Sequence, residues 1–112
     1  MKYALLIFDS PDGYTGMSDD DRAALSDEYS EIARDGRVTA GAQLQPVTTA
    51  TTVRVQDGQA LTTDGPFADT KEVFGGYYVF DAGNLDEALE LAGRIPAARY
   101  GGSVEVRPVV EL

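Results

Sequence analysis

The sequence predicts one α+β domain over residues 1–112, a ferredoxin-like sandwich with a hairpin inserted between its two halves. Apolar segments of strand length alternate with helical segments in the order strand, helix, strand, hairpin, strand, helix, strand. Because no internal repeat, low-complexity tract or linker-like change of composition divides the chain, we treat it as a single unit.

The first half begins with a strand and a capped helix. Residues 2–8 are a continuous apolar run, and the turn-forming cluster 9–13 follows it. Ser18 can cap a helix whose first turn, residues 19–21, places three aspartates at the positive end of the helix dipole. Apolar residues then recur at helical spacing: Leu25, Tyr29, Ile32 and Ala33. Gly36 ends the helix, and we assign the aspartates to helix capping rather than to a metal ion.

A hairpin separates the two halves. Residues 38–44 and 50–55 have strand character, and Asp57-Gly58 is a typical two-residue hairpin turn leading to a short return strand over residues 59–63.

The second half repeats the strand and helix pattern. Residues 77–81 form a buried strand, and Asn84 with Glu87 makes a capping box for the second helix, which stops before Pro96. We expect its apolar face to carry Leu85, Ala88, Leu89 and Ala92. The last strand, residues 104–112, alternates, with Val104, Val106 and Pro108 on the side opposite Glu105 and Arg107.

The first strand and the strand at residues 77–81 are apolar on both faces. Two helices can cover one face of such a sheet, and the other face would leave an apolar patch larger than soluble monomers usually expose. A second copy of the same sheet is the simplest cover, so we expect a homodimer with its sheets packed face to face.

The composition excludes several kinds of chemistry. Without Cys or His the chain offers no thiolate nucleophile, no imidazole base and none of the usual zinc or haem ligands. We therefore expect no metal and no cofactor. A formal charge of −10, from 19 acidic and 9 basic residues, argues against direct nucleic-acid binding. No membrane span or signal peptide is apparent, so we expect a cytoplasmic protein.

The segment from residue 62 to residue 72 is the most unusual in the chain. It has a structural interpretation, a β-turn in which Gly65 adopts an uncommon angle, Pro66 fixes φ and Phe67 fills the core. It also has a functional one, an active-site loop with Asp64 as acid or base and Lys71 as an anion ligand. The residues leave both interpretations open.

The same segment carries a resemblance to a known family. The stretches Thr63-Asp64-Gly65-Pro66-Phe67, Thr70-Lys71-Glu72 and Gly75-Gly76-Tyr77-Tyr78 resemble the signature of the DGPF branch of the YciI-related (YCII) proteins. The resemblance extends from Met1-Lys2-Tyr3 to the closing Val104-Glu105-Val106-Arg107-Pro108-Val109, and it implies a dimeric α+β barrel.

The resemblance implies a fold without supplying a reaction. Related enzymes on this barrel, muconolactone isomerase and a chlorinated hydroquinone dehydrochlorinase, are thought to pair a His with an acid, and this chain has no His. Only the acid of such a pair can have a counterpart here, for which Asp64 is the candidate.

Strand parity adds further candidate ligand-binding residues. Arg107 would face the cavity between the two sheets, either paired with Glu105 or across the dimer, or holding a carboxylate or phenolate. Tyr77 or Tyr78 can hydrogen-bond such a ligand or fill the core. The pair Gly75-Gly76 marks either a close approach of a ligand or partner to the backbone or a β-bulge.

Two functions from different classes follow. The first is a cofactor-free lyase or isomerase for a small aromatic or lactone-like metabolite, with Asp64 as acid or base and Arg107 as the anion clamp. The second is a non-catalytic dimeric protein that binds a small ligand or a protein partner, such as a sigma factor in transcriptional regulation.

Overall fold

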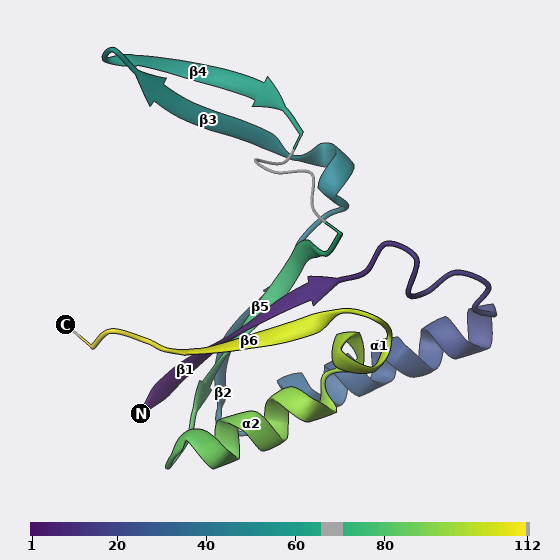
Figure 1. The fold of residues 1–112 in the computed structure, drawn as a ribbon. Helices are drawn as coiled ribbons and strands as arrows, with labels where there is room; N and C mark the ends of the chain where they lie inside the picture. Colours follow the sequence, from purple (N-terminus) through teal and green to yellow (C-terminus); the bar gives the residue numbers. More distant parts are fainter. Residues whose placement is uncertain (66–70, 112) are drawn as a thin grey trace.

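The computed structural model describes residues 1–65 and 71–111, so Pro66 and Phe67 of the predicted turn lie outside the described residues. Its centre is an antiparallel sheet of four strands in the order β2-β5-β1-β6 (Figure 1). The strands are β1 (Lys2–Asp9), β2 (Val38–Gln43), β5 (Val73–Asp81) and β6 (Ser103–Pro108).

Two α-helices cover one face of this sheet (Figure 1). They are α1 (Asp19–Ala33) and α2 (Leu85–Arg94), and the short 3-10 helix η2 (Pro96–Arg99) follows α2 and contacts both helices. A second 3-10 helix, η1 (Val47–Thr49), lies between β2 and β3 (Thr51–Gln56), away from the two α-helices (Figure 1). The predicted mixed α+β class is confirmed. Within the described residues, no helix is long and apolar enough to cross a membrane.

Local sequence signals set the helix starts. The Ser18 hydroxyl accepts a hydrogen bond from the Asp21 backbone N–H at 3.1 Å, and Asn84 accepts one from the Glu87 N–H at 3.0 Å. The Glu87 carboxylate reaches the N–H of Gly83, one residue before the cap, instead of closing the capping box on Asn84 itself.

The buried face of α2 differs from the predicted one. Ala88, Leu91 and Ala92 are buried, whereas Leu85 and Leu89 are each 48% exposed. Residues 88, 91, 92 and 95 share one helical face through the i, i+3, i+4, i+7 spacing, so the fully buried Ile95 continues this face beyond the helix. On α1, Leu25 and Ile32 are buried as predicted, but Ala33 is exposed.

The core lies between the helices and one face of the sheet. Alternate residues of β1 and β5 point into it, and Leu5 and Phe80 are fully buried there. Val104 and Val106 of β6 pack against the same cluster, as the alternation of the last strand predicts. That strand ends at Pro108 rather than at residue 112.

The opposite face, hereafter the open face, lies away from α1 and α2 (Figure 1). Register places there Lys2, Ala4, Leu6, Phe8, Ala40, Ala42, Tyr77, Val79, Asp81, Glu105 and Arg107. The apolar side chains of β1 on this face are half-buried, in contrast to the alternating buried residues of the core face. Among residues 1–65 and 71–111, the open face is therefore largely apolar and uncovered by any helix.

Strand β5 starts at Val73, four residues earlier than predicted. The pairing of β1 with β5 shifts between Ile7 and Phe8, whose partners are Gly76 and Phe74, so Gly75 is the extra residue of a β-bulge. Of the two interpretations of the glycine pair, the bulge is the one observed.

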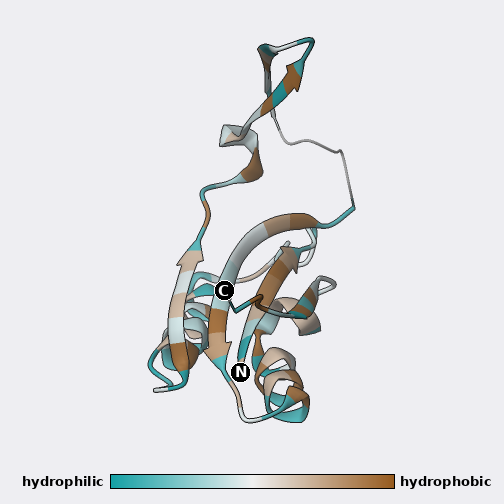
Figure 2. Ribbon diagram, turned by 90° about the vertical axis from the view of Figure 1, so that its left-hand side faces the viewer, coloured by the Kyte–Doolittle hydropathy of each residue, from teal (hydrophilic) through white to brown (hydrophobic). Residues whose placement is uncertain are grey.

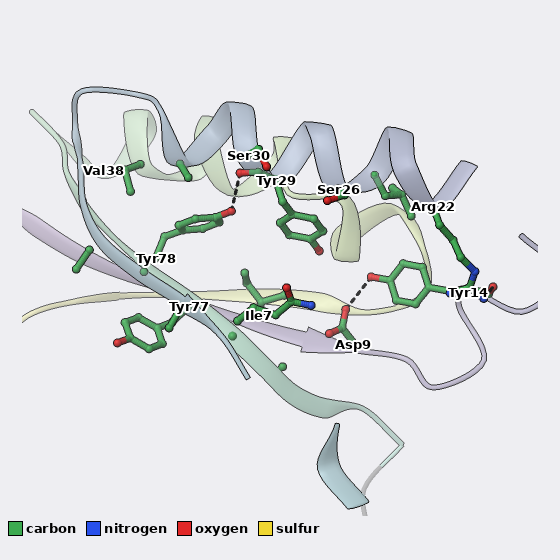
Figure 3. A pocket seen from close by; sticks show the side chains of 18 of the residues that line it. Ile7, Asp9, Tyr14, Arg22, Ser26, Tyr29, Ser30, Val38, Tyr77 and Tyr78 are labelled. Carbon is green, nitrogen blue, oxygen red and sulfur yellow. Dashed lines mark hydrogen bonds between the residues drawn. The ribbon is translucent and has the colours of Figure 1, made fainter. Parts of the chain in front are cut away.

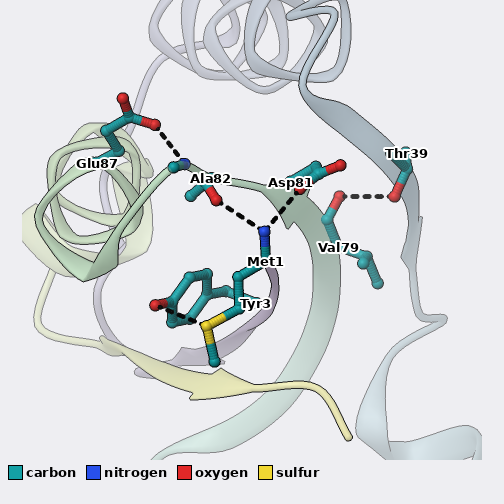
Figure 4. A network of polar contacts seen from close by, with 8 residues as sticks. Met1, Tyr3, Thr39, Val79, Asp81, Ala82 and Glu87 are labelled. Atoms are coloured by element: carbon teal, nitrogen blue, oxygen red, sulfur yellow. Dashed lines mark hydrogen bonds and ion pairs between the residues drawn. The ribbon is translucent and has the colours of Figure 1, made fainter. Parts of the chain in front are cut away.

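Polar contacts tie the end of β5 to the start of the chain (Figure 4). The amino group of Met1 donates to Asp81 Oδ1 at 3.1 Å and to the Ala82 carbonyl at 3.0 Å. On the neighbouring edge, the Thr39 hydroxyl donates to the Val79 carbonyl at 3.4 Å. These contacts hold β1, β2 and β5 in register at this end of the sheet.

The predicted hairpin forms a separate two-stranded sheet of β3 (Thr51–Gln56) and β4 (Gln59–Asp64), hereafter the arm. Asp57 and Gly58 have φ of 51° and 76°, as a tight two-residue hairpin turn requires. The arm projects away from the sheet and helices (Figures 1 and 2). The radius of gyration, 15.8 Å, exceeds the roughly 13 Å expected of a compact chain of this length.

Candidate active site

A cavity of about 700 Å³ lies between α1 and the sheet, hereafter the α1 slot. One face of α1 forms its roof through residues one turn apart: Arg22, Ser26, Tyr29, Ser30 and Ala33. Strand β2 and parts of β1 and β5 form the floor. The volume falls within the range of small-molecule sites.

Asp9, the last residue of β1, supplies the carboxylate of the slot (Figure 3). The Tyr14 hydroxyl donates a hydrogen bond of 2.7 Å to its Oδ1 atom. A Cβ atom placed on Gly75 would overlap the Oδ2 atom of Asp9, so this carboxylate occupies the space beside the bulge that a side chain would take. A larger residue at position 75 would therefore move the Asp9 side chain from this position.

Two tyrosine hydroxyls lie near this end of the slot. The Tyr14 hydroxyl donates its proton to Asp9, and the Tyr29 hydroxyl accepts a hydrogen bond of 3.3 Å from the N–H of Ala97. Burial raises the pKa of both phenols, and the bond to Asp9 raises that of Tyr14 further.

Two further side chains border the slot. The Tyr78 hydroxyl donates to the Tyr29 carbonyl at 3.0 Å, and burial raises the pKa of this phenol too (Figure 3). Arg22 donates to the Tyr14 carbonyl at 3.2 Å and so ties α1 to the loop that carries Tyr14. This arrangement holds a carboxylate and a phenol donor against a cavity, which is a geometry suited to proton transfer.

The residues that the sequence suggested for a site lie in several places. Tyr78 lines the α1 slot with its ring, whereas the Tyr77 ring lies on the other side of β5 (Figure 3). Arg107 is on the open face, 3.9 Å from Glu105, with 70% of its side chain exposed. This contact supports the interpretation that Arg107 pairs with Glu105.

The loop residues are separated from the α1 slot. Asp64 ends β4 opposite Thr51 and is exposed. Gly65, with φ of +103°, donates to the Ala50 carbonyl and accepts from the Thr52 hydroxyl at the base of the arm. Lys71 borders a second, shallow cavity of about 730 Å³ lined also by Phe8, Ser10, Glu72 and Gly101. The roles of Asp64 and Lys71 stay predictions.

Asp9, Tyr14, Tyr29 and Arg22 were not identified from the sequence. Asp9 was counted among the turn formers after the first strand, and Tyr29 among the apolar residues of the first helix. The available signal was an acid directly after an apolar strand, in step with the buried residues Leu5 and Ile7. In the described ranges, 1–65 and 71–111, no group of three acids could hold a metal ion.

Comparison with known proteins places the chain in context. The YCII-related domain matches residues 1–112. An uncharacterized protein of Rhizobium meliloti (strain 1021) is 42% identical over 90 residues, which cover 80% of this chain and 70% of that protein.

A solved structure is similar over nearly the whole chain. It is the 5-chloro-2-hydroxyhydroquinone dehydrochlorinase of Burkholderia phenoliruptrix AC1100 in complex with 2,5-dihydroxybenzoquinone. The TM-score is 0.53 at 17% identity, and the match covers 98% of this chain and 94% of the other. At that identity the similarity shows the fold alone.

Proposed function

Because the chain belongs to the YCII-related domain family, we propose that the α1 slot is the active site of a cofactor-free lyase or isomerase acting in the cytoplasm on a small aromatic or lactone-like metabolite. The observation that carries this proposal is the Asp9 carboxylate, which accepts one hydrogen bond from Tyr14 and borders a cavity of about 700 Å³. The ring compound bound to the structural neighbour is consistent with such a substrate class.

The chemistry assigned to the slot is general acid–base catalysis. Asp9 takes a proton from the substrate, and its hydrogen bond from Tyr14 holds the carboxylate in position for that transfer. In an isomerase the proton returns at another atom of the substrate. In a lyase the electron pair of the broken bond forms a double bond as the leaving group departs with its own pair.

We also propose that the protein belongs to the DGPF branch and forms a dimeric α+β barrel of two ferredoxin-like subunits joined through their open faces. The distribution of charge supports the open face as the dimer interface. Helix α1 carries six acids and one arginine, net −5, and α2 a net −2. The charged strand residues of the open face balance, with Lys2 and Arg107 against Asp81 and Glu105. Two copies can therefore meet there with little repulsion.

The dimer has a direct test. Light scattering at micromolar concentration should give twice the mass of the 12.0 kDa chain. Leu6→Glu places a charge at the centre of the open face and should yield monomers, whereas Leu85→Glu on the exposed side of α2 should not. A parent protein of monomeric mass would contradict the barrel.

One observation favours the second candidate function, a non-catalytic accessory protein that binds a ligand or a protein partner. The arm exposes Val53 and Val55 by 61% and 72%, and isolated hairpins are only marginally stable in water. A partner that covers these residues would account for them. The earlier candidates Asp64 and Arg107 remain proposals for a separate ligand site.

A thermal-shift screen tests the proposed site, with a metabolite library that includes 2,5-dihydroxybenzoquinone. A ligand at 100 times its dissociation constant should add about 2.7 kcal/mol of stability. Asp9→Asn and Gly75→Ala should abolish the shift, because one removes the base and the other displaces it. Asp12→Asn, in the neighbouring exposed turn, should keep it. A ligand response that survives Asp9→Asn contradicts the assignment.

A further inference from the structure

The α1 slot is elongated. Its roof runs along α1 from Arg22 to Ala33, eleven steps or roughly 16.5 Å at about 1.5 Å per residue. Its floor runs along β2 from Val38 to Gln43, five steps or roughly 16.5 Å at about 3.3 Å per residue. The two lengths agree. The cavity volume of about 700 Å³ holds roughly twenty non-hydrogen atoms at liquid density.

The two ends of the slot differ in polarity (Figure 3). Register places Gln43 opposite Gly76 and Gly76 opposite Ile7, so this end of β2 lies next to Asp9. Val38 pairs with Phe80 at the far end, where Ala33 also lines the cavity. A ligand that fills the slot therefore has a polar end at Asp9 and an apolar end between Ala33 and Val38.

The direction of the hydrogen bonds determines whether the polar end of a ligand must donate or accept a hydrogen bond. The Tyr14 proton is committed to Asp9 Oδ1, and the Tyr78 proton is committed to the Tyr29 carbonyl of the helix backbone. Within the described residues, no hydrogen bond reaches Asp9 Oδ2. A carboxylate only accepts, so a ligand that bonds to this atom must be a donor.

Charge disfavours an anionic ligand at the same place. The roof helix has a net charge of −5, and Asp9 adds its own negative charge at the polar end. Arg22, the cation of the slot lining, is exposed, and its Nη2 atom is bound to the Tyr14 carbonyl rather than paired with Asp9. An anion would have to approach the Asp9 carboxylate beneath a helix of net negative charge.

We propose that the α1 slot binds an elongated, uncharged ligand of at least two fused rings that donates a hydroxyl to Asp9 at one end and places its apolar end between Ala33 and Val38. This proposal rests on the proposed function for the location of the site, and it adds length, charge and orientation. It differs from an anion-binding site, which the sequence suggested at Arg107.

Calorimetric titration of the full chain with four probes tests the proposal. The first, 6-butyl-2-naphthol, is an uncharged bicyclic donor with its hydroxyl at one end and an apolar chain at the other. Its methyl ether lacks the donor, 6-butyl-2-naphthoate replaces it with an anion, and hydroquinone keeps the donor on a single ring. We expect the butylnaphthol to bind at least tenfold more tightly than each of the others. Asp9→Asn should reduce that affinity at least tenfold, because Tyr14 then binds the amide oxygen and leaves the NH₂ group facing the ligand.

Two alanine variants on the same helix test the length. Ala33→Leu fills the far end and should weaken binding of butylnaphthol at least tenfold while leaving hydroquinone binding unchanged. Ala24→Leu, exposed and outside the cavity lining, is the matched control and should change neither. The proposal would be overturned by any of three results. The bicyclic donor does not bind, or binds no more tightly than hydroquinone; the naphthoate binds more tightly than the bicyclic donor; or Ala33→Leu has no effect. If only hydroquinone binds and its binding depends on Asp9, the proposed function stands and this inference is wrong. If the binding of no probe depends on Asp9, both are wrong.

Discussion

The body of the protein, its four-stranded sheet with two helices, and the arm contain similar apolar residues in opposite surroundings. In the body, Leu5 and Phe80 are completely buried beneath the helices. In the arm, Val53 and Val55 face solvent, and the hydrogen bond of 2.7 Å from the Gly65 N–H to the Ala50 carbonyl closes the base of the hairpin itself.

This difference shows that a regular strand ladder is not by itself a source of stability. The arm has full register from Thr51 to Asp64 and a well-formed turn, but no third layer removes its side chains from water. The body gains its stability where sheet and helices exclude water together. Substitutions should therefore have large effects in the body and small or local effects in the arm.

The largest expected effect is in the body core. Phe80→Ala should lower the free energy of unfolding by about 3–5 kcal/mol, because it removes a fully buried ring and leaves a cavity. Val55→Ala in the arm should change it by less than about 0.5 kcal/mol. Urea denaturation measures both, and equal losses would show that the arm is packed against a partner in solution.

A smaller and local effect is expected at the arm turn. Gly58 has φ of +76°, and a β-branched residue there costs about 1–3 kcal/mol of backbone strain. Gly58→Val should speed amide hydrogen exchange across β3 and β4 while the melting temperature of the body stays the same. The reference variant is Gly36→Val, at a glycine with negative φ and nothing within 4 Å of an added Cβ. A matching fall in melting temperature would show that arm and body unfold together.

Asp64 tests whether the arm has a role in ligand binding. Since this residue is exposed, Asp64→Asn and Asp64→Ala should each change stability by no more than about 0.5–1.5 kcal/mol. We expect the ligand response of the α1 slot to persist in both variants and to be lost in Asp9→Asn. If both Asp64 variants fold like the parent protein and lose the ligand response, Asp64 regains the acid or base role.

The smallest effect concerns the turn between α1 and β2, on the surface of the body. Hydrogen bonds from Arg37 lower the pKa of Asp35 from 3.8 to about 2. A carboxyl whose pKa is lower in the folded state stabilises the fold above its unfolded pKa, and this contribution is lost as the pH falls through 4 toward 2. Because Arg37 is exposed to solvent, the contribution of the pair is small.

Acid titration of stability measures this contribution. Asp35→Asn should reduce stability slightly at pH 6 and flatten its decline between pH 4 and pH 2. Asp12→Asn removes the same charge from an exposed turn and serves as the control. An unchanged acid profile in Asp35→Asn would mean that the ion pair contributes nothing to folding.

The sequence by itself determined the features that depend on neighbours within a few residues. Ser18 and Asn84 cap their helices because each side chain reaches an N–H three residues away. Asp57-Gly58 turns the arm because these residue types tolerate positive φ. Period-two alternation also placed Val104 and Val106 toward the helices and Glu105 and Arg107 on the opposite face.

Only the tertiary structure decided the site and the helix faces that pack. The exposure of Leu85 and Leu89 depends on how α2 lies on the sheet, which its own periodicity does not fix. The α1 slot brings together Asp9, Tyr14 and Tyr29 with the backbone of Ala97, 68 residues beyond Tyr29. The bulge at Gly75 leaves the space for the Asp9 carboxylate. Such contacts depend on the path of the whole chain, because the residues that form them carry no local signal of their partners.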